Sequence, residues 1–135
     1  MIPVRDNAAL TIASLFAILL SSLHLADDIA RGFEKGGVGT LIGVLIFAIW
    51  LYGTLGLAGR RSGYIIILVG SVLALAAPVV HMSGRGIGSQ VAHSDGGFFF
   101  AWTLIAIGMS AFGSAMLAAH GLWSARSAEL PRSTI

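Results

Sequence analysis

Apolar residues gather in four long stretches of the chain, at about residues 8–26, 38–58, 64–82 and 98–123. None of the four stretches contains Asp, Glu, Lys or Arg. A helix needs about 20 apolar residues to cross the ~30 Å hydrocarbon core of a bilayer. We therefore expect an all-α integral membrane protein: a bundle of four antiparallel transmembrane helices, forming a single domain over residues 1–135.

The basic residues in the short connections predict the orientation, because cytoplasmic loops carry an excess of Lys and Arg. One side of the predicted bundle would carry five basic residues: Arg5, Arg60, Arg61, Arg126 and Arg132. The other side would carry three: Arg31, Lys35 and Arg85. We expect both termini to be cytoplasmic, and the protein to be integral to the plasma (inner) membrane of a bacterium.

The composition excludes several classes of protein. Of 135 residues, 56% are hydrophobic and 10% are charged, whereas a soluble domain is about 25% charged. This argues against a soluble globule and a disordered chain. The net charge is only +2, and no basic run is present, so a nucleic acid is not an expected partner. The absence of cysteine excludes disulfides and thiolate metal sites.

Small residues recur on one face of each predicted helix, which favours helix packing, because lipid-embedded helices associate through close contact of small side chains. We expect these faces to form the interior of the bundle; an interface with a second copy is the alternative. The stripes are Ser14, Ala17, Ser21 and His24; Gly39, Gly43, Gly53 and Gly56; Gly70, Ala74, Ala77 and His81; Ser110, Ser114, Ala118 and Gly121. Pro78 predicts a kink or an early helix end near His81, with a kink that opens room for a ligand as the alternative.

Three of the four histidines, and four of the six carboxylates, fall on the predicted outer side. Imidazole and carboxylate ligands suit Zn, Fe or Mn, and a nearby thioether such as that of Met82, Met109 or Met116 would allow copper. The candidate metal ligands are His24, Asp27, Asp28, His81, His93 and Asp95. Spacings of i, i+3 and i+4 place the first three on one helix face if the helix continues past Ala26.

Other interpretations of these residues stay open. Asp27 and Asp28 precede Arg31 by four and three residues, which is ordinary charge pairing on a short helix at the membrane surface. A haem held between His24 and His81 is a further version of the metal hypothesis. His120, near the opposite membrane face, is explained by packing or snorkelling.

The functional interpretation rests largely on absences. The chain resembles small multidrug transporters in having four short-looped helices, but its first span lacks the buried carboxylate on which they depend, which disfavours a proton-driven transporter. No arrangement of a serine with a base and an orienting acid is evident, and no motif matches a characterised family residue by residue.

We expect a small membrane protein without catalysis of its own, acting as an accessory, structural or interaction subunit and requiring no cofactor. Its partners would be the lipid bilayer and another membrane protein or a second copy. The alternative is a metal- or haem-binding, redox-active membrane protein with an outward-facing His/Asp site. A small transporter is the second alternative.

Overall fold

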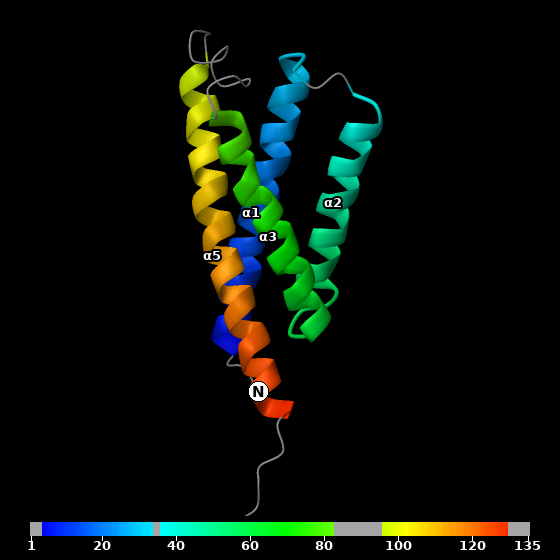
Figure 1. Ribbon diagram of the computed structural model, residues 1–135, viewed down its shortest axis with the longest axis vertical. Coiled ribbons are helices and arrows are strands. Elements are labelled where there is room, and N and C mark those ends of the chain that lie inside the picture. The colour runs from blue at the N-terminus through cyan, green and yellow to red at the C-terminus, as the bar shows by residue number, and fades with distance from the viewer. Residues whose placement is uncertain (1–3, 34–35, 83–95, 130–135) are drawn as a thin grey trace, which may run out of the picture.

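The computed structural model describes residues 4–33, 36–82 and 96–129, and this part of the chain is helical with short turns (Figure 1). The helices are α1 (Val4–Ala30), α2 (Val38–Leu55), α3 (Arg61–Met82) and α5 (Gly97–Glu129). All four are long and apolar enough to cross a membrane, judged by length and composition. The prediction of four such helices is confirmed.

The helix ends differ from the predicted ones by several residues. α1 continues through Ala30, past the predicted end at residue 26. At about 1.5 Å per residue, the 27 residues of α1 span ~40 Å and the 33 residues of α5 span ~50 Å. Both lengths exceed the ~30 Å apolar layer of a bilayer. α2 ends at Leu55, and the turn before α3 includes Gly59, whose φ of +74° suits a residue without a side chain.

Buried hydrogen bonds between hydroxyl groups connect the helices. Ser71 of α3 donates a hydrogen bond of 2.9 Å to Ser114 of α5. The hydroxyl groups of Ser14 in α1 and Thr54 in α2 are hydrogen-bonded at 2.8 Å. Such bonds stabilise helix association in lipid by ~0.6 kcal/mol on average. They therefore fix which faces meet while contributing modestly to stability.

Glycines allow close approach of large side chains at three helix contacts. A Cβ atom at Gly121 of α5 would lie 2.6 Å from the ring of Tyr64 on α3, and one at Gly70 would lie 2.5 Å from the Trp50 indole. One at Gly53 would lie 2.5 Å from Ile66. The predicted small-residue faces are thus largely interior, but Gly39 and Gly56 are exposed, so the prediction is wrong for these two glycines.

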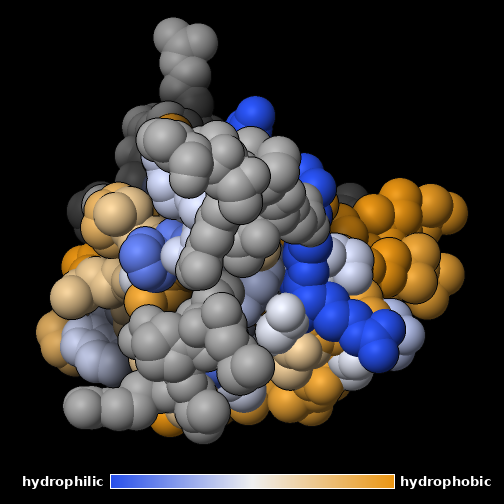
Figure 2. All heavy atoms as spheres, turned by 90° about the horizontal axis from the view of Figure 1, so that it is seen from below, coloured by the Kyte–Doolittle hydropathy of each residue, from blue (hydrophilic) through white to orange (hydrophobic). Residues whose placement is uncertain are grey.

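The sides of the bundle are apolar, as the rim of hydrophobic residues in the end-on view of Figure 2 illustrates. α2 is the least enclosed helix: 17% of its most apolar stretch is buried, against 33% in each of the other helices. Its buried residues are Trp50, Gly53 and Thr54. All three lie in the half of α2 nearest α3 in sequence, so the other half packs more loosely.

Candidate metal centre

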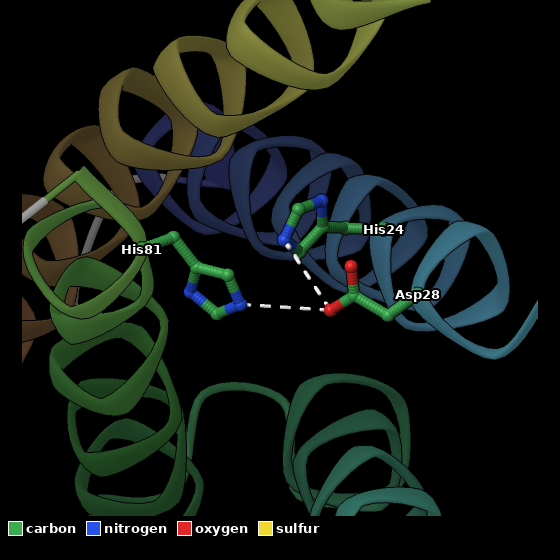
Figure 3. Close-up of side chains that lie close together, drawn as sticks. All are labelled: His24, Asp28 and His81. Atoms are coloured by element: carbon green, nitrogen blue, oxygen red, sulfur yellow. Dashed lines mark ion pairs between the residues drawn. The ribbon is translucent and has the colours of Figure 1, made fainter. Parts of the chain in front are cut away.

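Three side chains from two helices converge where α1 and α3 end and α5 begins, which we call the histidine end of the bundle (Figure 3). His24 and Asp28 are one helical turn apart on α1, and His81 lies in the last turn of α3. The Oδ2 atom of Asp28 lies 3.7 Å from Nε2 of His24 and 3.5 Å from Nε2 of His81. One ligand atom from each residue lies within 4.8 Å of the other two.

The group is shielded from solvent, and part of it lacks hydrogen bonds. His24 is 5% exposed and Asp28 is 6% exposed. Both ring nitrogens of His24 and the Oδ1 atom of Asp28 are buried and have no hydrogen-bond partner among the described residues. A buried polar group left unpaired costs ~1–3 kcal/mol, so native proteins rarely keep several together without a purpose.

The backbone determines which nitrogen of His81 faces Asp28. Nδ1 of His81 lies 2.8 Å from the carbonyl oxygen of Ala77, one turn earlier in α3. A carbonyl oxygen only accepts hydrogen bonds, so Nδ1 carries the proton and donates it. In the neutral ring, Nε2 is then an unprotonated lone-pair donor directed at Asp28, as in a metal-binding histidine oriented by a carbonyl.

Phe100 of α5 packs against the two imidazoles. Its ring centroid lies 4.9 Å from that of His24 and 6.0 Å from that of His81, and the two imidazole centroids are 5.0 Å apart. Phe100 is 3% exposed, so it separates this side of the group from the surroundings. Phe100 was not among the candidate site residues of the sequence; its position at the start of α5, level with the ends of α1 and α3, was the available signal.

A mainly apolar pocket of about 230 Å³ adjoins the histidines. All three members of the group line it, together with residues of α1, α2, α3 and α5. Ser21 and Trp50 also line this pocket, and the Ser21 hydroxyl and Trp50 indole nitrogen are buried without a hydrogen-bond partner in the described part of the chain. The polar group therefore borders a cavity rather than a solid core.

The remaining predicted ligands are placed differently or not described. Asp27 accepts a hydrogen bond of 2.8 Å from Nε of Arg31 and lies outside the group of three. The charge-pairing interpretation thus holds for Asp27, but Asp28 turns to the histidines instead. Residues 27–30 form the last turn of α1 rather than part of a separate short helix. His93 and Asp95 lie outside the described residues.

Two other predictions concern side chains far along α5. Met109 and Met116 are 73% and 59% exposed, so neither thioether is directed into the interior, which removes their support for copper. The Met82 side chain is outside the described part of the structure. His120 is exposed near the opposite end of α5, in agreement with snorkelling rather than with a second buried site.

Two of the three distances between the ligand atoms are close to those expected around a small divalent ion. Metal bonds of about 2.0–2.1 Å in a tetrahedral site place neighbouring ligand atoms ~3.3–3.5 Å apart. The two distances to Asp28 Oδ2, 3.5 and 3.7 Å, lie near that range. They are also too long for good hydrogen bonds. Comparison with protein-family models, curated proteins and solved structures finds no match.

Proposed function

We propose that this chain is an integral membrane protein that binds one divalent transition-metal ion through His24, Asp28 and His81. The observation that carries the proposal is the convergence of one ligand atom from each of these residues, of which His24 and Asp28 are buried and His81 is half-buried. Both ring nitrogens of His24 and one carboxylate oxygen of Asp28 lack hydrogen-bond partners among the described residues. A cation among them would be coordinated by the nitrogen and oxygen lone pairs that face one another. We therefore favour metal binding, which the sequence raised as an alternative, over a purely structural role of these polar residues.

A proton is the competing cation, and the geometry favours a metal ion. A proton on Nε2 of His81 would pair that ring with Asp28 and leave His24 unsatisfied. A metal ion would contact all three residues at once. The aspartate would also offset part of the ion's charge, which lowers the cost of holding it in an apolar setting.

The donor set narrows the choice of ion. Two imidazoles and one carboxylate are typical of zinc sites with an open position and of non-haem ferrous sites. A haem is disfavoured, because the His24 and His81 rings contact each other edge to face at 5.0 Å. A macrocycle between them would have to separate the two rings and displace Asp28.

The membrane arrangement is part of the same proposal. Contacts of Tyr64 with Gly121, and of His81 with Phe100, support antiparallel packing of α3 and α5. Contacts of Ser14 with Thr54, and of Leu25 with Gly43, support the same for α1 and α2. With both termini cytoplasmic in a bacterial inner membrane, the metal site would lie near the outer face. It would thus bind metal from outside the cytoplasm.

Metal titration of the purified protein in nanodiscs tests the proposal. We expect one Zn²⁺ or Co²⁺ per chain, measured by elemental analysis and by the visible bands of Co²⁺. The variants Asp28→Asn and His81→Gln should each weaken binding by about 100-fold or more, exceeding the ~10–100-fold typical of losing a ligand's outer hydrogen-bond partner. Circular dichroism and elution profiles verify that each variant is folded.

Asp27→Asn is the matched control, since it removes the neighbouring carboxylate, which pairs with Arg31. It should bind Co²⁺ as the unmodified chain does. Equal losses in Asp27→Asn and Asp28→Asn would indicate a nonspecific charge effect. A protein that binds no stoichiometric metal at pH 7.5 would refute the proposal.

The accessory role stays a prediction, favoured by the loosely packed half of α2. Val38 and Leu41 on this helix are 73% and 68% exposed, an apolar face that another membrane protein would be able to cover. Co-purification of a defined partner that is lost when Leu41 is changed to Lys would support this role. A single-component particle from native membranes would oppose it.

A further inference from the structure

The pocket beside the three candidate ligands has the features of a binding site for a small molecule. Its volume is about 230 Å³, below the ~300–1,000 Å³ of pockets for drug-sized ligands. Its wall is mainly apolar, with side chains such as Phe47, Leu73 and Ile107, and its polar members include His24, Asp28 and His81. A short apolar chain with one polar end matches this distribution, whereas a whole phospholipid is too large.

The metal ion would leave one coordination position for an outside ligand. Three protein ligands and an open fourth position are the usual arrangement of zinc sites that bind substrates. A divalent ion held by two neutral imidazoles and one carboxylate keeps a net charge of +1. The open position therefore favours an anionic oxygen ligand, and the pocket supplies the adjoining space.

Ser21 provides an independent indication of a polar ligand end. It lies one turn before His24 on α1 and lines the same pocket. Its buried hydroxyl has no hydrogen-bond partner among the residues described. A hydroxyl both donates and accepts, so Ser21 would donate to the second oxygen of a carboxylate bound at the ion.

We infer that the pocket binds a short-chain carboxylate, with the carboxylate on the metal ion and the alkyl chain among the apolar side chains; this rests on the metal site proposed above. Ser21 positions the carboxylate, and the pocket volume limits the chain length. Each CH₂ group buried contributes ~0.8 kcal/mol. Affinity should therefore rise with chain length until the pocket is full.

The test uses Co²⁺-loaded protein in nanodiscs, titrated with acetate and with hexanoate and followed by the visible Co²⁺ bands. We expect hexanoate to bind at least 10-fold more tightly than acetate. Ser21→Ala should weaken both about 5-fold, the equivalent of one hydrogen bond of ~1 kcal/mol. Hexanol should not displace hexanoate, because it lacks the anionic end.

The variant Gly43→Leu distinguishes binding in the pocket from binding at the metal site. Gly43 lines the pocket, and a Cβ atom there meets only Leu25, at 3.4 Å, so a larger side chain enters the cavity. This variant should keep Co²⁺ and acetate affinity and lose at least 10-fold in hexanoate affinity. The matched control is Gly113→Leu on α5, where an added Cβ meets nothing within 4 Å.

Each outcome decides the inference. Equal affinity for acetate and hexanoate, or an unchanged hexanoate affinity in Gly43→Leu, overturns it while Co²⁺ binding still supports the metal site. A matching loss in Gly113→Leu shows that an added leucine lowers hexanoate affinity without entering the pocket, which also overturns it. Failure of the unmodified chain to bind Co²⁺ refutes both proposals.

Discussion

The Nδ1 atom of His81 donates a hydrogen bond of 2.8 Å to the carbonyl oxygen of Ala77. This bond lies within α3 and needs no partner from another helix. It fixes both the tautomer and the direction of the ring, so Nε2 faces Asp28 before any ion binds. His24 has no such bond in the described residues, and its ring is positioned by packing on Phe100.

Metal affinity should fall with decreasing pH. Both imidazoles must be neutral to bind an ion, so protons compete with the metal. We expect the Co²⁺ dissociation constant to rise at least about 10-fold between pH 7.5 and pH 5.5. Isothermal titration at several pH values measures this. A constant affinity over the range would contradict ligation by histidine.

The hydrogen bond between Ser71 and Ser114 should contribute measurably to stability. Both residues are fully buried, and the average for such bonds in membranes is ~0.6 kcal/mol. A double-mutant cycle with Ser71→Ala and Ser114→Ala should give a coupling energy of about that size in denaturant titrations. The variants should leave Co²⁺ affinity unchanged. A coupling energy of zero would show that the two hydroxyls act independently.

Gly121→Ala should weaken the contact between α3 and α5. The added methyl group would lie 2.6 Å from the Tyr64 ring, and that ring is held by a 2.7 Å hydrogen bond from Tyr64 to Asn7. Overpacking of this kind costs ~1–3 kcal/mol, to be measured as a change in unfolding free energy. Gly113→Ala is the control and should cause no loss, because space around it is open.

The proposed orientation predicts the behaviour of reporter fusions. Fusions after Arg61 and after Arg126 should both report the cytoplasm, and a fusion within residues 83–97 should report the opposite side. The reason is the excess of basic residues on the predicted inner side. A reversed pattern would place the histidine end in the cytoplasm and change the source of the metal, while leaving the ligand geometry as it is.

The sequence was sufficient to predict much of the fold because each apolar stretch carries its own signal. The length of a stretch fixes a membrane-spanning helix locally, without knowledge of its neighbours. The end of α1 was harder to predict, since its last turn contains the polar residues Asp27 and Asp28, which are not part of the apolar stretch, and the helix nevertheless continues through Ala30. The exposure of Gly39 depends on the tilt of α2 against its neighbours, and the periodicity of a single helix carries no information about that tilt.

The candidate site was predictable in part for the same reason. Spacing of four residues placed His24 and Asp28 on one face, and helix order brought His81 to the same end. The sequence did not predict that Asp28 faces the histidines while Asp27 pairs with Arg31. Asp27 and Asp28 follow His24 by three and four residues, both close to one helical turn, so the direction of each side chain decides its partner. The pocket was not predictable, because its shape depends on the relative tilt of four helices. The packing of Phe100 on the imidazoles was not predictable for the same reason.

The loose packing of α2 has a consequence for how the molecule is assembled. Helices in a bilayer insert first and associate afterwards, and the least buried helix has the least to gain from docking. Because His24, Asp28 and His81 come from α1 and α3, the three ligands can meet before α2 docks. The pocket requires α2, since Gly43, Phe47 and Trp50 form part of its wall. Assembly would then proceed in two stages, with the ion site completed first and its cavity closed last.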